Sequence, residues 1–250
     1  WEHVPDAEPR VFGDRLYVYG SHDRSGGCDF CIDDYVGWSA PTNDLSAWRK
    51  EGVIFAKSDD PSNPDGTVPL YAPDCVRGPD GRYYLYYVLD RRKDHVVGVA
   101  VCDKPAGRFR YLGNVRYEDG TPLGRGPGDE LAFDPAVLVD GERVFIYLGG
   151  NRGSGGWVTE LKSDMLTAIT RPKRVIPGRN ESVGNVEKRI VLSGTVQEKL
   201  MNSFTPLKTA SSVPVIINLR YDVLSSLDIA KSMLDKGITE GQIVIAGDYG

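Results

Sequence analysis

The feature that most constrains this sequence is a threefold internal repeat within its first 178 residues. Each copy has an aspartate beside a proline, a short apolar segment, a Gly/Asp turn, and a strand rich in tyrosine and β-branched residues. The copies are led by Asp6, Asp74 and Asp134, which precede an arginine by nine, eight and nine residues. A repeat built only of short strands predicts a repetitive β fold.

The repeats also predict how many strands each unit contains. A hairpin opens each unit, and its second strand is expected at residues 16–20, 83–87 and 144–148. A third strand is expected at 35–39, 96–101 and 156–161, and a closing segment at 52–55 and 109–112 in the first two units. Four antiparallel strands per unit without intervening helices are typical of propeller blades. We therefore predict a mainly β fold, a partial β-propeller with blades at about 1–65, 66–128 and 129–178.

In a propeller the first strand of every blade lies nearest the central axis, so equivalent positions in successive blades converge. We expect Asp6, Asp74 and Asp134 to occupy such positions and to share one site. The alternative is that each aspartate only caps the turn beside its proline, as aspartate commonly does.

The last 72 residues have a different composition. All four tryptophans, and all but three of the tyrosines and phenylalanines, precede residue 179. We place a domain boundary near Pro177 and Gly178 and expect 179–250 to be a small α/β segment: strands at 189–192, 213–219 and 242–246, with a helix over 224–234. This segment has no phosphate loop and no assigned function. It is either a second domain or the result of truncation or fusion. Because three blades alone leave sheet edges exposed, we also expect a partner, or self-association, that completes the ring.

Charge and cysteine content narrow the function classes. No apolar run approaches the roughly 18 residues of a membrane span, and a net charge of −5 argues against nucleic acid as a partner. Cys28 and Cys31 form a C-x-x-C, but no second pair follows, so buried thiols are favoured over a zinc or redox site. We predict no metal and no cofactor. The few cysteines favour a reducing, cytoplasmic location, although the chain opens at Trp1 without a methionine or a signal core, so an incomplete N-terminus is expected and localisation stays open.

Several motifs in this order resemble glycoside hydrolase family 43, whose members are five-bladed β-propeller glycosidases. The resemblance covers residues 1 to about 178, the first three blades. It is carried by residues 4–7, 16–23 and 38–41 in the first unit, by 70–74 and 81–87 in the second, and by 133–135 with 140–141 in the third.

The resemblance implies an inverting hydrolase of the arabinofuranosidase or β-xylosidase type that acts on arabinofuranosyl or xylosyl linkages of plant-derived poly- or oligosaccharides. Asp6 matches the general base, Asp134 the carboxylate that tunes the pKa of the general acid, and Asp74 a site-lining position. The family's general acid is a glutamate of the fourth blade. Glu181 and Glu187 lie in the expected region without reproducing its motif, and Glu160 lies on a strand with a structural role, so the acid stays unassigned.

The residue types suit this chemistry. Inverting hydrolysis uses one ionised and one protonated carboxyl about 6.5 to 9.5 Å apart, and a nearby third carboxylate raises the pKa of the acid. Sugar rings pack on flat apolar faces, for which Phe30, Trp38, Tyr71 and Trp157 are candidates, although each could equally pack within its blade. His22 either reaches the funnel or bonds a neighbouring turn. The alternative functions are a carbohydrate-binding propeller that has lost its acid and a scaffold for a protein partner.

Overall fold

The computed structural model describes residues 2–27, 29–89, 95–130, 132–149 and 155–176, together with three short strands further on. The chain divides into two compact units, Trp1–Arg174 and Val175–Gly250.

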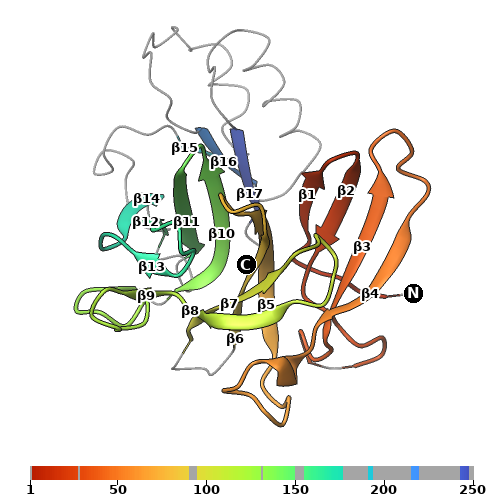
Figure 1. Ribbon diagram of the computed structural model, residues 1–250, viewed down its shortest axis with the longest axis horizontal. Coiled ribbons are helices and arrows are strands. Elements are labelled where there is room, and N and C mark those ends of the chain that lie inside the picture. Colours follow the sequence, from red (N-terminus) through yellow and green to blue (C-terminus); the bar gives the residue numbers. More distant parts are fainter. Residues whose placement is uncertain are drawn as a thin grey trace, which may run out of the picture. The chain divides into compact units, whose positions relative to one another are not determined.

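The first unit consists of three sheets, mostly antiparallel, that follow one another along the chain (Figure 1). The first two have four strands each, in chain order, as the sequence predicted. They are β1 (Glu8–Phe12), β2 (Arg15–Tyr19), β3 (Tyr35–Pro41) and β4 (Arg49–Phe55), and then β5 (Leu70–Arg77), β6 (Tyr83–Leu89), β7 (Val97–Cys102) and β8 (Arg110–Asn114). A single 3₁₀ turn, η1 (Lys57–Asp59), lies between the two sheets in sequence.

The sheets pack face to face through two apolar clusters, as neighbouring propeller blades do. One cluster joins the first and second sheets through tyrosines and aliphatic side chains such as Tyr19, Tyr35 and Leu85. The other joins the second and third sheets through Tyr86, Val99 and Ile146, among others. Most tyrosines of the second strands of the first two sheets are thus core residues, because their rings bury a large apolar surface while the hydroxyl still finds an acceptor. Tyr86, for example, donates to the carbonyl of Met165 at 2.8 Å.

The strand register corrects one sequence-based expectation. Asp74 pairs with Tyr86, and the equivalent partners of Tyr19 and Tyr147 are Glu8 and Ala136. Asp74 is therefore equivalent to those two residues and not to Asp6 and Asp134. In the second sheet, Ala72 takes the position of the two leading aspartates.

The physical reason is the length of the second hairpin turn. Arg77 pairs with Tyr83 across five intervening residues, whereas the turns of the first and third hairpins contain only two. Because of this longer loop, the spacing from the leading aspartate to the arginine of the turn does not identify equivalent residues in the second repeat. The tyrosine of the second strand is the equivalent landmark in all three sheets.

The third sheet closes differently from the other two. It contains β10 (Phe133–Asp140), β11 (Arg143–Gly149) and β12 (Gly156–Leu161), followed by the two-residue β13 (Thr167–Ala168), while β14 (Lys173–Ile176) also pairs with β12. Asp164 accepts the backbone N–H groups of Leu166 and Thr167 at 2.9 and 2.8 Å and so turns the chain back early. β13 then pairs in parallel with β9 (Arg116–Tyr117), which comes from the linker before this sheet.

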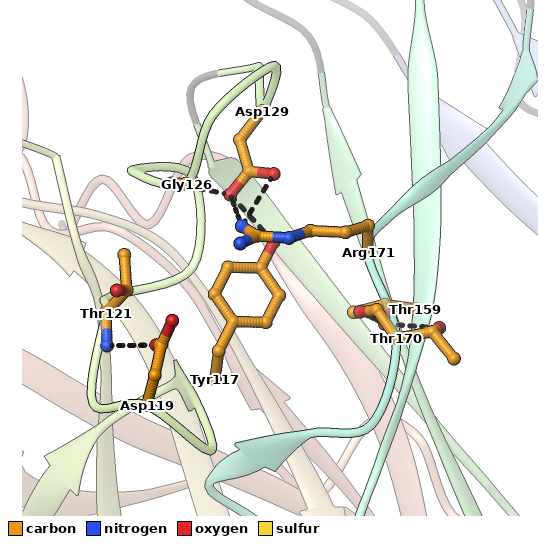
Figure 2. Close-up of polar contacts among 8 residues, drawn as sticks. All are labelled: Tyr117, Asp119, Thr121, Gly126, Asp129, Thr159, Thr170 and Arg171. Atoms are coloured by element: carbon orange, nitrogen blue, oxygen red, sulfur yellow. Dashed lines mark hydrogen bonds and ion pairs between the residues drawn. The ribbon is translucent and has the colours of Figure 1, made fainter.

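A polar cluster anchors that linker (Figure 2). The hydroxyl of Tyr117 donates to Asp129 at 2.7 Å, and the backbone N–H of Gly126 donates to the same oxygen at 2.9 Å. The guanidinium of Arg171 lies 3.9 Å from the centre of the Tyr117 ring and 3.4 Å from Asp129. A Cβ atom at Gly126 would overlap the guanidinium of Arg171, so a side chain here would displace that guanidinium. The cluster holds the chain that leads into Phe133 and Asp134.

The second unit contains a three-stranded parallel sheet of β15 (Val191–Ser193), β16 (Val215–Leu219) and β17 (Ile243–Gly247). All three strands overlap the segments where the sequence predicted them, and β15 and β17 each extend one residue further. The helix expected over 224–234 lies outside the described residues. Within the part of the chain that is described, no helix is long and apolar enough to cross a membrane.

Candidate active site

Asp6 and Asp134 occupy the same position at the start of the first strand of their sheets. Asp6 precedes β1 by two residues, and Asp134 lies at the beginning of β10. Both have positive φ, 51° and 44°, in the left-handed region that aspartate tolerates better than most residues. Both are exposed. This backbone turn interrupts the pairing with the second strand just ahead of the regular register, and so presents each carboxylate at the strand end.

The pKa shifts of two buried side chains indicate that the carboxylates of Asp6 and Asp134 lie in one neighbourhood. Burial raises the pKa of the Cys31 thiol to about 12, the hydroxyl of Ser21 opposes this, and the negative charges of Asp6, Asp23 and Asp134 raise it further. Burial also raises the pKa of Tyr35, with added contributions from Cys31 and from both aspartates. The charges of Asp6 and Asp134, which belong to different sheets, thus both raise the pKa of the Cys31 thiol and of the Tyr35 phenol.

Sequence reasoning missed these surrounding residues. Ser21, Cys31 and Tyr35 are all buried, with 0 to 2% of their surface exposed. The carboxylate of Asp23 accepts the backbone N–H of Cys31 at 2.6 Å, which fixes the loop between β2 and β3 beside the site. The hydroxyl of Tyr35 donates to the carbonyl of Tyr71 at 2.8 Å and ties this loop to the second sheet. The available signal was the run of polar residues directly after the second strand, at Ser21 to Asp23.

Asp74 has a different environment from the other two aspartates. It is 1% exposed, and its carboxylate accepts two hydrogen bonds from Arg10 at 2.9 and 2.7 Å. The backbone N–H of Val137 donates to the same carboxylate at 2.6 Å. Asp74 thus connects the first strands of all three sheets. Its contact with a sugar stays a prediction.

Glu8 lies beside this ion pair, 3.2 Å from Arg10. Burial and the charge of Asp74 raise the pKa of Glu8 to about 7, and Arg10 opposes the rise. The inner strands therefore carry a second group of ionisable residues, Glu8, Arg10 and Asp74, in addition to Asp6 and Asp134.

The residues expected to hold a sugar fall into different places. Tyr71 lies one residue before Ala72, and its ring is 5.8 Å from that of Phe133, next to Asp134. His22 directly follows Ser21, and its Nδ1 lies 2.8 Å from the carbonyl oxygen of Asp34. Tyr71 thus contacts a neighbour of Asp134, and His22 bonds the backbone of Asp34. Contact of either residue with a sugar stays a prediction.

The other three aromatic candidates lie further out. Phe30 is 72% exposed on the loop between β2 and β3, where it lines a shallow hollow with His3 and Asp23. Trp38 and Trp157 lie on the third strands of their sheets, β3 and β12. The indole of Trp38 donates to Glu2 at 3.0 Å, and the guanidinium of Arg174 covers the ring of Trp157. Their contact with a sugar stays untested.

Glu160 does not have the environment of a proton donor. Both of its carboxylate oxygens accept hydrogen bonds from Arg143, at 2.9 and 2.8 Å, and this pairing lowers its pKa. Glu181 and Glu187 lie outside the described residues. Among the described residues, no group of three or more His, Cys, Asp or Glu side chains is arranged to hold a metal ion.

Comparison with known proteins matches most of the chain to one family. The sequence profile of glycosyl hydrolases family 43 matches residues 6–191. A xylosidase/arabinosidase of Thermoclostridium stercorarium is 56% identical over 190 residues, which cover 74% of this chain and 40% of that protein. Xylosidase/arabinosidase 43A of Humicola insolens is 32% identical over 158 residues, 59% of this chain and 44% of that protein. The chain thus spans less than half the length of these relatives.

Solved structures share the fold. The GH43_1 enzyme from Xanthomonas citri complexed with xylose superposes with a TM-score of 0.56 at 22% identity, over 78% of this chain and 57% of that one. An α-L-arabinofuranosidase from Clostridium thermocellum gives a TM-score of 0.50 at 29% identity, over 67% of this chain and 55% of that one. Together with the repeated four-stranded sheets and the paired positions of Asp6 and Asp134, these matches establish that the chain belongs to glycosyl hydrolases family 43.

Proposed function

We propose that this chain supplies the water-activating part of an inverting glycoside hydrolase that acts on arabinofuranosyl or xylosyl linkages of plant-derived poly- or oligosaccharides. The observation that carries the proposal is the equivalence of Asp6 and Asp134: the same strand position, the same left-handed backbone, exposed carboxylates and shared neighbours in Cys31 and Tyr35. Relatives named xylosidase/arabinosidase support the choice of pentoses.

In this proposal Asp6 is the general base. Its ionised carboxylate removes a proton from a water molecule that attacks the anomeric carbon from the face opposite the leaving group. The bond between the anomeric carbon and the leaving oxygen breaks as the new bond forms, and the sugar configuration inverts. A protonated carboxyl on the other face donates its proton to the leaving oxygen.

Asp134 acts on that acid and on the developing charge. A carboxylate near the acid raises its pKa by like-charge repulsion, which keeps it protonated near neutral pH. The negative charges of Asp134 and Asp6 also stabilise the positive charge of an oxocarbenium-like transition state. Glu160 is excluded from the role of acid by its bidentate pairing with Arg143.

The test is hydrolysis by the purified chain of aryl α-L-arabinofuranoside and aryl β-D-xyloside, followed by ¹H NMR of the anomer first released. We expect turnover with inversion, and retention would contradict the proposal. Asp6→Asn, which keeps the volume and removes the charge, should abolish turnover. Asp14→Asn, at an exposed turn of the same sheet, is the matched control.

A second substrate distinguishes the alternative of a propeller without its acid. An aryl leaving group needs little protonation, whereas an unactivated xylo- or arabino-oligosaccharide needs the acid. Hydrolysis of both substrate types supports the complete mechanism. Sugar binding measured by calorimetry without any turnover would instead favour the carbohydrate-binding alternative.

A further inference from the structure

Ser21 is a fully buried residue that lies two positions after the end of strand β2, next to Gly20. Its hydroxyl donates to Oδ2 of Asp6 at 3.2 Å and accepts the backbone N–H of Ala72 at 2.9 Å. The same hydroxyl lowers the pKa of the Cys31 thiol. One side chain in the first sheet therefore contacts Asp6 and the second sheet at the same time.

The two residues that Ser21 bonds are the equivalent, left-handed positions of neighbouring sheets. Asp6 has φ of 51° and Ala72 has φ of 27°. A residue with a Cβ in this region is strained by about 1 to 2 kcal/mol, and alanine has no side-chain oxygen with which to compensate. Such a conformation persists only where its surroundings hold it. The hydroxyl of Ser21 supplies a bond to each.

We propose that Ser21 is a positioning residue for the general base, a role that rests on the proposed function of Asp6. Its hydroxyl engages Oδ2 of Asp6 and so fixes the orientation of the carboxylate, which directs Oδ1 to the attacking water. Its bond to the Ala72 N–H fixes the same hydroxyl against the second sheet. The position of Asp6 is thereby fixed by a contact to the second sheet as well as by its own strand.

Steric contacts around Gly20 support this arrangement. A Cβ atom at Gly20 would lie 2.7 Å from the carbonyl oxygen of Pro5 and from a side-chain carbon of Val4. The backbone that precedes Ser21 thus packs directly on the segment that leads into Asp6. Close packing of the two backbones leaves the hydroxyl of Ser21 little freedom to choose other partners.

The experiment compares Ser21→Ala with Ser39→Ala and Asp6→Asn in the full chain, using aryl pentosides. Ser39 is the matched control, because it is equally buried and its hydroxyl bonds Arg15 and Glu51 elsewhere in the same sheet. We expect Ser21→Ala to lower kcat about tenfold to a hundredfold, as misplacement of a catalytic group does, with KM changed less than about twofold. Ser39→Ala should lower thermal stability while leaving kcat near the wild-type value. Ser21→Cys, which keeps a weak donor, should fall between Ser21→Ala and the wild type.

The outcomes separate the two proposals. If Asp6→Asn is inactive and Ser21→Ala keeps the kcat of Ser39→Ala, the positioning role is wrong and the assignment of Asp6 stands. If Asp6→Asn turns over at the wild-type rate, the proposed function is wrong. A wild-type chain without turnover also contradicts the proposed function, and crystal structures then decide the role of Ser21. If the Asp6 carboxylate and the Ala72 backbone have the same positions in Ser21→Ala as in the wild type, the positioning role of Ser21 is wrong. Rotation of the Asp6 carboxylate in Ser21→Ala would support that role.

Discussion

Arg10 of the first sheet binds both carboxylate oxygens of Asp74 of the second sheet, at 2.9 and 2.7 Å, and Asp74 also accepts the backbone N–H of Val137 of the third. The side chain of Asp74 is 2% exposed and that of Arg10 is 27% exposed. A bidentate pair in such surroundings has fixed geometry and is poorly screened by solvent. The innermost strands of the three blades are thus joined through one buried charge.

Removal of the arginine should therefore destabilise the chain strongly. Arg10→Met leaves Asp74 as a buried carboxylate whose counter-ion is gone, at a cost of about 3 to 5 kcal/mol in the free energy of unfolding. Arg82→Met is the matched control, because Arg82 pairs with Asp80 at 2.7 Å where both side chains are well exposed. That variant should lose less than about 1 kcal/mol. Equal losses in urea denaturation would contradict a special role for the buried pair.

Glu8 should make the stability of the chain depend on pH. Its pKa rises from 4.5 to about 7 in the folded state, so the folded protein binds a proton that the unfolded chain has released between these values. Stability from Glu8 is complete below pH 4.5 and is lost as pH rises through about 7. Glu8→Gln should therefore raise Tm more at pH 8 than at pH 5. Glu142→Gln, at an exposed turn, should show no such difference, and the same shift in both variants would refute the assignment.

The polar cluster of Figure 2 provides a test of the linker that precedes Asp134. The side chain of Asp129 is 3% exposed and accepts bonds from Tyr117 and Gly126, so Asp129→Asn should cost about 1.5 to 3 kcal/mol. Asp119, in the same linker, bonds only the backbone N–H of Thr121 two residues on among the contacts described. Asp119→Asn should cost less than about 1 kcal/mol. Chemical denaturation of the two variants under identical conditions measures the difference.

The thiol of Cys31 should report the two leading carboxylates without any substrate. Asp6→Asn and Asp134→Asn each remove a charge that raises the pKa of this thiol, so the reactive thiolate becomes more abundant. Alkylation of Cys31 by iodoacetamide at pH 8, followed by peptide mass spectrometry, should accelerate roughly two- to fivefold in each variant.

Cys75 is the internal control for that measurement. It is equally buried, and the charges that act on it are those of Asp74 and Arg10. A variant that merely unfolds more often would accelerate alkylation at both cysteines. Acceleration at Cys31 alone confirms the neighbourhood, and an unchanged rate at Cys31 would place the carboxylates elsewhere.

Much of this fold could be read from the sequence, because strand patterning and turn residues act locally. The hairpins before Tyr17, Tyr84 and Phe145 are where the alternation of turn and aromatic strand predicted them. Cys31 and Cys75 are buried and Cys102 is half-buried, whereas Cys28, the other half of the C-x-x-C, lies outside the described residues.

The error over Asp74 and the missed serine have physical causes. One long turn shifted the spacing of the second repeat, and only hydrogen-bond pairing shows which residue faces which. Ser21 and Ala72 are 51 residues apart, and a single serine after a strand carries no local pattern that announces a bond to another sheet. Contacts between distant segments depend on packing, which composition and periodicity do not encode.

The parallel pairing of β9 with β13 bears on how such a protein could be divided or rearranged. Arg116 and Tyr117 precede the third repeat in the chain yet lie in its sheet, so the sequence repeat and the folded blade do not share a border. A gene segment excised at the repeat boundary would carry a blade that lacks a strand. A segment used for duplication, grafting or circular permutation of this blade therefore has to begin ahead of Arg116, because the folded blade begins there and not at the start of the sequence repeat.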